Sequence, residues 1–302
     1  MNFLPNLFLL RWDIARSLHI EYYPYFNLVA RSSMVPTMHP MLNIAVRVAR
    51  SAGRILLRYL EHTDRIAVTN KRRNDFVSEV DHSAEEAIIR ELRSKYPDHA
   101  ILAEESGECQ GSDFQWVIDP LDGITNYLHG FPQFCVSIAL KYRNRLEQAV
   151  VYDPLREELF TASRGQGAQL NDRRLRVTGR PSLEGTLIGT GLPYRDYSHL
   201  DTYLGMCKAM LQDTAGIRCP GSAALDIAYV AAGRLDGFWE LGLAQRNIAA
   251  SALLVSEAGG TVSDLAGGDR YLKTGNVIAG NLKVHQAMVA RLRPFLSDSL
   301  RA

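Results

Sequence analysis

The chain has 302 residues, of which 46% are hydrophobic and 22% charged, and its formal net charge is +1. This composition is typical of a globular protein with one large or two ordinary domains, and it excludes disorder as the main state. Because the net charge is close to zero, no broad electrostatic footprint for nucleic acid or membrane exists, so we expect a small-molecule partner.

The four cysteines are Cys109, Cys135, Cys207 and Cys219, and they form no Cys-x-x-Cys pair. Such wide spacing, without clustered histidines, argues against a zinc site and against a disulfide scaffold. We therefore expect a reducing, cytoplasmic location.

Residues 1–37 differ from the rest of the chain. Their apolar run at residues 7–10 is too short to span a bilayer, and they lack the positive segment and cleavage site of a secretory signal. We expect an N-terminal extension that is disordered or a start-site artefact. A helix that docks on the core through its apolar residues is the alternative.

Two amphipathic helices are predicted next. The first begins near Met38, because apolar residues from Ala45 to Tyr59 recur on one helical face. The second follows Asp81, which stands where an N-cap would.

Strands follow these helices. Residues 100–103 and 116–118 are short apolar runs that read as buried strands, and they end at Glu104 and Asp119. Two strand ends thus present carboxylates. Further strands are predicted within residues 134–165, and the glycine-marked stretch 165–171 favours a hairpin connection over a phosphate loop.

Residues 119–125, Asp-Pro-Leu-Asp-Gly-Ile-Thr, form the most informative motif. Pro120 removes a backbone donor at the strand's end, so that Asp119 and Asp122 can converge. The N–H groups after Gly123 would open a helix and favour an anion such as phosphate. Mg²⁺ prefers carboxylate oxygens combined with substrate phosphate oxygens. The motif predicts a metal site beside a phosphate site, or else an Asp-rich turn that only caps a helix.

The second half of the chain alternates predicted helices and strands. Helices are expected at residues 221–232 and from Asn247, as N-cap, to the Gly259–Gly260 stop, and strands at residues 237–240 and 261–264. We divide the chain into the extension, residues 1–37, a metal- and phosphate-binding half, residues 38–180, and a substrate-completing half, residues 181–302.

Three motifs in this order resemble the inositol monophosphatase family: Glu104-Glu-Ser, Asp119-Pro-Leu-Asp-Gly and Glu257-Ala-Gly-Gly-Thr-Val-Ser-Asp. The resemblance covers residues 38–302. It implies an α/β fold, the αβαβα layered sandwich of that family, usually as a homodimer. It also implies Mg²⁺-dependent hydrolysis of phosphate monoesters such as inositol 1-phosphate.

The resemblance further implies roles for individual residues. Asp81 would accept a proton from the attacking water, and the catalytic set is Asp81, Glu104 and Thr125. The metal ligands would be Glu104, Asp119, the Leu121 carbonyl, Asp122 and Asn247. The substrate side would comprise Glu104, Leu121, Asp122, Gly123, Ile124, Arg218, Gly221, Ala223, Glu240 and Asn247.

This chain departs from the family pattern at two places. The family's Asp-Gly-Thr-Thr is Asp-Gly-Ile-Thr here, so Ile124 replaces a hydroxyl near Asp81, and Thr125 is rotated by about 100° along the helix. The family's Trp-Asp pair is Arg246-Asn247. Asparagine keeps an oxygen that can ligate Mg²⁺ but loses a charge, and we favour its other role as an N-cap.

Two functional classes follow. One is a Mg²⁺-dependent phosphatase impaired by Ile124 and Asn247. The other is a catalytically weakened member that acts in ribosomal RNA transcription antitermination with Nus factors, RNA polymerase and RNA, a role associated with one group of bacterial members of the family. A membrane partner is not expected.

Overall fold

The computed structural model describes residues 38–60, 68–72, 75–193 and 197–301. Within this part the chain forms one compact unit that begins at Met38. The expectations for residues 1–37 lie outside the described residues and stay predictions. In the described ranges, no helix is both long and apolar enough to cross a membrane.

The first two helices are α1 (Pro40–Leu60) and α2 (Glu79–Lys95), with the antiparallel pair β1 (Val68–Arg72) and β2 (Asp75–Ser78) between them. The predicted apolar face of α1 is confirmed, because Val48, Ala52 and Leu56 are fully buried. The N-cap prediction for Asp81 was wrong. Since β2 leads directly into α2, the helix begins at Glu79, and Asp81 is its third residue and is buried.

The first sheet has eight strands in the order β10-β9-β8-β7-β6-β5-β3-β4, antiparallel except for the parallel pair β3 and β5. Its strands are β3 (Ala100–Leu102), β4 (Glu108–Cys109), β5 (Phe114–Asp122), β6 (Cys135–Tyr142), β7 (Arg145–Asp153), β8 (Glu158–Ser163), β9 (Gly167–Leu170) and β10 (Arg173–Arg174). Strand β5 runs on to Asp122 instead of ending at Asp119, with an irregular register between these two residues.

The hairpin predicted at residues 165–171 is confirmed, because β8 and β9 pair antiparallel across it. Glu257 fixes this turn from the end of α6 (Gln245–Glu257): its two carboxylate oxygens accept hydrogen bonds from the Gly165 and Gly167 N–H groups, each at 2.8 Å. Glu257 therefore has a structural role.

The second sheet has the order β12-β11-β13-β15-β14. Its strands are β11 (Leu187–Thr190), β12 (Gly216–Arg218), β13 (Gly237–Glu240), β14 (Thr261–Ser263) and β15 (Val277–Gly280). The remaining helices are α3 (Ile124–Leu128), α4 (Leu200–Leu211), α5 (Ala223–Ala231), α7 (Tyr271–Thr274), α8 (Leu282–Leu292) and α9 (Asp298–Arg301), with a 3₁₀ turn at Arg293–Phe295.

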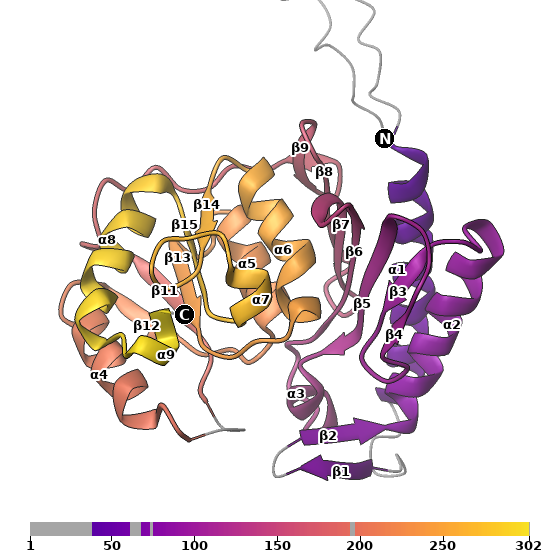
Figure 1. Cartoon of the computed structure of the whole chain (residues 1–302), viewed down its shortest axis with the longest axis horizontal. Helices are drawn as coiled ribbons and strands as arrows, with labels where there is room; N and C mark the ends of the chain where they lie inside the picture. Colours follow the sequence, from indigo (N-terminus) through magenta and orange to yellow (C-terminus); the bar gives the residue numbers. More distant parts are fainter. Residues whose placement is uncertain (1–37, 61–67, 73–74, 194–196, 302) are drawn as a thin grey trace, which may run out of the picture. The chain divides into compact units, whose positions relative to one another are not determined.

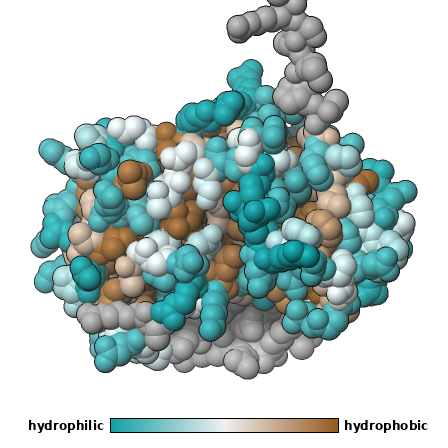
Figure 2. Space-filling view, turned by 45° about the horizontal axis from the view of Figure 1, so that its top comes forward, coloured by the Kyte–Doolittle hydropathy of each residue, from teal (hydrophilic) through white to brown (hydrophobic). Residues whose placement is uncertain are grey.

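These elements stack in five layers (Figure 1, right to left): α1 and α2, the first sheet, α5 and α6, the second sheet, and α4 with α8. The predicted αβαβα sandwich is confirmed. The middle layer can approach both sheets because its helices are rich in small residues, and Ala224, Ala228, Ala249 and Ala252 are fully buried. Figure 2 shows one face of the molecule, where hydrophilic side chains cover much of the surface and apolar ones lie between them.

Candidate active site

A cavity of about 430 Å³ lies where the end of β5 meets the beginnings of α3, α5 and α6. Strand β5 brings Asp119 and Asp122 to its wall, and β13 ends there with Glu240. Helix α2 contributes Asp81, and the loop after β3 contributes Glu104. One cavity thus collects acidic side chains from these four segments of the chain.

The turn after β5 depends on a glycine. Gly123 has φ of 99°, a conformation that residues with a Cβ rarely adopt, and a Cβ there would lie 2.8 Å from the Gln133 carbonyl oxygen. Helix α3 can therefore start at Ile124, as predicted, with Ile124 and Thr125 both at the cavity wall. The Ile124 side chain belongs to the apolar core beneath the first sheet.

Asp122 is held from the far half of the chain. Its Oδ2 accepts hydrogen bonds from the Ser222 hydroxyl at 2.6 Å and from the Ala224 N–H at 2.8 Å. Ser222 is the N-cap of α5, and Ala224 lies in its first turn, where unpaired N–H groups favour a negative charge. The start of α5 therefore fixes the direction of the Asp122 carboxylate.

Glu104 is positioned by a buried carboxylate on α2. Glu85 accepts hydrogen bonds from the N–H groups of Glu105, at 2.8 Å, and Ser106, at 2.7 Å. These bonds pin the loop that follows β3. Glu104 then forms an ion pair with Arg246, whose Nη2 lies 2.6 Å from Glu104 Oε1.

We expected Asn247 to be the N-cap of α6, and this prediction was wrong. Ala244 takes that place, and Asn247 is the third helical residue, whose Oδ1 accepts a hydrogen bond from the Ala244 N–H at 3.1 Å. This bond turns the amide nitrogen toward the acidic residues. Asn247 Nδ2 donates to Asp119 Oδ2 at 2.6 Å and to Asp122 Oδ1 at 3.2 Å.

Because several carboxylates lie close together in this cavity, the pKa values of two of them are raised. Burial, followed by the charges of Glu104 and Asp122, raises the pKa of Asp119 well above its usual value, and Arg246 opposes this change. The pKa of Asp226 on α5 is also raised, by burial and then by Asp122. Such shifts in a cavity are typical of functional sites.

The structure brings together nearly all the predicted site residues. Those that line the cavity are Asp81, Glu104, Asp119, Leu121, Asp122, Gly123, Ile124, Thr125, Gly221, Ala223, Glu240 and Asn247. Arg218 lies apart from this lining at the end of β12, where it is exposed and its Nη1 donates to the Ile217 carbonyl. Its role toward substrate stays a prediction.

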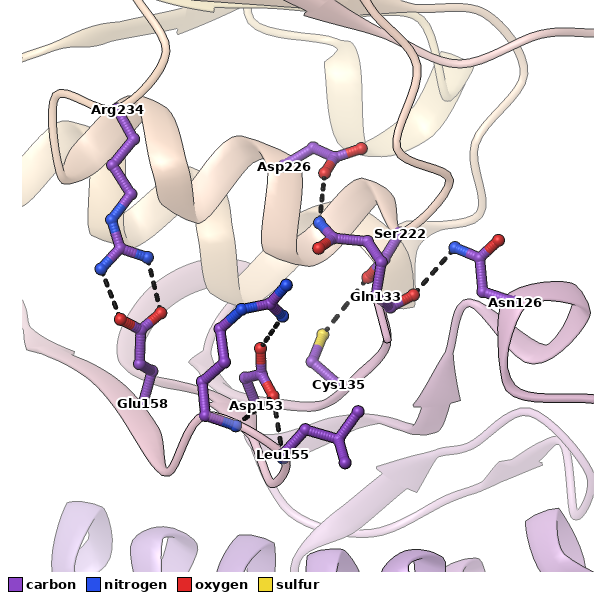
Figure 3. Close-up of polar contacts among 10 residues, drawn as sticks. Asn126, Gln133, Cys135, Asp153, Leu155, Glu158, Ser222, Asp226 and Arg234 are labelled. Atoms are coloured by element: carbon purple, nitrogen blue, oxygen red, sulfur yellow. Dashed lines mark hydrogen bonds and ion pairs between the residues drawn. The ribbon is translucent and has the colours of Figure 1, made fainter. Parts of the chain in front are cut away.

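Several cavity residues escaped the sequence analysis, among them Asn126 and Asp226. Asn126 Nδ2 donates to the Gln133 carbonyl at 2.8 Å, and Gln133 Nε2 donates to Asp226 Oδ1 at 2.9 Å (Figure 3). Asn126 Nδ2 also donates to the Pro220 carbonyl at 2.8 Å. Asp226 is the one acidic residue in the otherwise apolar sequence 223–231, and this pattern could have identified it as a candidate site residue.

The donor chemistry at this site fits Mg²⁺. Asp119 and Asp122 converge on one hydrogen-bond donor, the Asn247 amide, and two carboxylates that share a donor can share a cation. In the described ranges, however, no three His, Cys, Asp or Glu side chains already stand at the spacing of a closed metal site. The carboxylates are instead joined by Arg246 and Asn247.

Comparisons with known proteins agree with this geometry. The chain is 56% identical to the Nus factor SuhB of Pseudomonas aeruginosa and 53% identical to that of Escherichia coli, in each case over 87% of this chain and the whole of that protein. Among solved structures, the extragenic suppressor protein suhB of Bartonella henselae matches with a TM-score of 0.82 at 43% identity, covering 84% of this chain and 99% of that one.

The inositol monophosphatase of Anabaena matches with a TM-score of 0.74 at 35% identity, over 84% of this chain and 95% of that one. The sequence pattern of the inositol monophosphatase family matches residues 37–297. The chain therefore belongs to the inositol monophosphatase family.

Proposed function

We propose that the protein hydrolyses small polyol phosphates, such as inositol 1-phosphate, with the help of Mg²⁺. The observation that carries this proposal is the convergence of Asp81, Glu104, Asp119 and Asp122 on one cavity. Its volume of about 430 Å³ is within the range of small-molecule sites. Family membership supports phosphate-ester chemistry, while the inositol substrate and the metal belong to the proposal.

Glu104, Asp119, the Leu121 carbonyl and Asp122 would hold the metal. When bound, Mg²⁺ polarises a phosphoryl group and lowers the pKa of an attacking water. Asp81 takes up the proton of that water, and the N–H groups of Gly123 and Ile124 orient the phosphate. Glu240, which also lines the cavity, accepts hydrogen bonds from substrate hydroxyls.

Two residues should keep this activity low. Ile124 carries no hydroxyl to orient the water, and Asn247 holds two carboxylates through an amide in place of a further negative charge. We expect slow turnover that requires more Mg²⁺ than a site with an aspartate at position 247.

The test is phosphate release from inositol 1-phosphate across a Mg²⁺ series. Asp119→Asn and Asp122→Asn should each abolish the release, and Asp201→Asn, at an exposed position on α4, should not change it. Release that persists in Asp119→Asn, or no release at any Mg²⁺ concentration, would show that the proposed function is wrong.

A second function is supported by the two relatives named Nus factor SuhB, which align over their whole length. We propose that the chain also acts with Nus factors and RNA polymerase in antitermination of ribosomal RNA transcription. Asp119→Asn should leave this role intact, since the site would not be used. In vitro transcription through a ribosomal RNA leader, with and without the protein and its Asp119→Asn variant, tests this; equal read-through without the protein would refute it.

We further propose that the protein is a homodimer in solution. Sedimentation equilibrium of the full chain measures the mass directly. A monomer mass at working concentration would exclude this assembly.

A further inference from the structure

Arg246 is a charged side chain placed against the acidic wall of the cavity. It lies in the first turn of α6, and the exposed fractions of Arg246 and of its partner Glu104 are 24% and 18%. Its Nη2 lies 2.6 Å from Glu104 Oε1. An ion pair that is shielded from water to this degree is stronger than one on the surface.

The guanidinium acts on more than Glu104. It is close enough to Asp119 and Asp122 to interact electrostatically with both, and the neighbouring Asn247 amide donates to the same two carboxylates. Residues 246 and 247 together supply one positive charge and the hydrogen-bond donors that join three acidic side chains. This is the electrostatic task that a divalent cation performs in a carboxylate site.

Arg246 does not use all of its hydrogen-bond donors at this cluster. Within the described part of the chain, its buried Nε has no hydrogen-bond partner. Arg234, by contrast, directs two guanidinium nitrogens to the two carboxylate oxygens of Glu158, in the geometry that arginine prefers (Figure 3). Arg246 is therefore positioned by charge more than by a full set of hydrogen bonds.

We propose that Arg246 is an internal counter-ion that competes with a divalent metal for Glu104 and Asp119. The inference rests on the proposed function, because it concerns the metal which that function requires. Arg246 keeps the acidic cluster folded without metal, and Mg²⁺ enters only after the guanidinium leaves. Metal affinity is consequently low in the unmodified chain and rises when the charge of Arg246 is removed.

The experiment measures Mn²⁺ binding to the full chain by titration of the free-Mn²⁺ EPR signal, with Mg²⁺ competition. Arg246→Met removes the charge and keeps an apolar stem, and Arg246→Gln keeps a donor for Glu104 should the first variant fail to fold. We expect each variant to bind Mn²⁺ at least about tenfold more tightly, because a positive charge beside the ligands has gone. Arg246→Lys retains the charge and should bind as weakly as the unmodified chain.

Melting temperature provides a second readout. In EDTA, Arg246→Gln should melt below the unmodified chain, and added Mg²⁺ should restore the loss. The matched control is Arg234→Met, which breaks an arginine–carboxylate pair elsewhere; it should lower the melting temperature without any response to Mg²⁺.

Equal Mn²⁺ affinity in the unmodified chain and Arg246→Gln, or Mn²⁺ binding by neither, would overturn the inference. Tighter Mn²⁺ binding by the variants without phosphate release by any of the proteins would refute the proposed function and leave this inference standing. Phosphate release by the unmodified chain, together with equal Mn²⁺ affinity in the unmodified chain and the variants, would overturn this inference and leave the proposed function standing.

Discussion

Asp119 and Asp153 lie near the ends of two strands of the first sheet but in different electrostatic surroundings. Strands β5 and β7 both pair antiparallel with β6, so they run in the same direction and end at the same edge. Both carboxylates are buried, with exposed fractions of 1% and 0%. The comparison separates a carboxylate that stabilises the fold from one that is available for chemistry.

The difference lies in the partners. Asp153 Oδ1 accepts hydrogen bonds from the N–H groups of Leu155, at 2.9 Å, and Arg156, at 3.0 Å, and its Oδ2 pairs with the Arg156 guanidinium at 2.6 Å (Figure 3). Asp119 lies among three other carboxylates, those of Glu104, Asp122 and Asp81. Its Oδ1 accepts one local hydrogen bond, from the Leu121 N–H at 3.2 Å, and residues 246 and 247 supply its other compensation. Local partners satisfy Asp153 fully, whereas like charges surround Asp119.

The largest expected effect follows from removing Asp153. Asp153→Ala leaves two N–H groups without their acceptor and removes a buried carboxylate that pairs with the exposed Arg156 guanidinium, so the free energy of unfolding should fall by about 3 kcal/mol. Urea denaturation with EDTA present measures it. Asp201→Ala, which removes an exposed carboxyl, should stay within about 0.5 kcal/mol of the unmodified chain. If Asp153→Ala lowers the free energy of unfolding by no more than Asp201→Ala does, Asp153 does not stabilise the fold and the contrast with Asp119 fails.

Two adjacent glutamates on α2, Glu85 and Glu86, provide a second comparison between a carboxylate that stabilises the site and one that does not. Glu85 is buried and holds the loop that presents Glu104, while Glu86 is exposed. We expect Glu85→Ala to cost about 2 kcal/mol, through loss of hydrogen bonds to a buried charge, and to weaken Mn²⁺ binding. Glu86→Ala should change neither quantity. If both variants bind Mn²⁺ like the unmodified chain, the loop does not position Glu104.

The smallest effect concerns pH. Because the pKa of Asp119 is raised in the folded state, the folded protein binds more protons than the unfolded chain above the ordinary aspartate range. The contribution of Asp119 to stability is thus fully present below that range and is lost as pH rises through the folded-state pKa. In EDTA, Asp119→Asn should gain stability relative to the unmodified chain as pH increases. Denaturation curves at several pH values check this; a gain that shrinks with pH has the wrong sign.

Much of the fold could be predicted from sequence, because its signals are local. The apolar face of α1, the runs that became β3 and β5, and the hairpin between β8 and β9 depend on residues close along the chain. The carboxylates of the site could be identified for the same reason, since Asp119 and Asp122 flank one turn. Even so, the starts of α2 and α6 were misplaced by two residues or more.

The arrangement inside the site could not be predicted, since it depends on contacts between distant segments. Ser222 reaches Asp122 across 100 residues of chain, and Arg246 reaches Glu104 across 142. Sequence identifies Arg246-Asn247 as a departure from the family pattern, yet only the packing of α6 against β5 shows that the two residues join the acidic side chains.

The central claim is that the acidic cluster is compensated from within the chain. Anomalous diffraction from crystals equilibrated with millimolar Mn²⁺ tests it most directly. We predict no Mn²⁺ peak beside Glu104 and Asp119 in the unmodified chain, with Arg246 still paired to Glu104, and a clear peak there in Arg246→Met. A strong peak at this place in the unmodified chain, with Arg246 turned away from Glu104, would contradict the account.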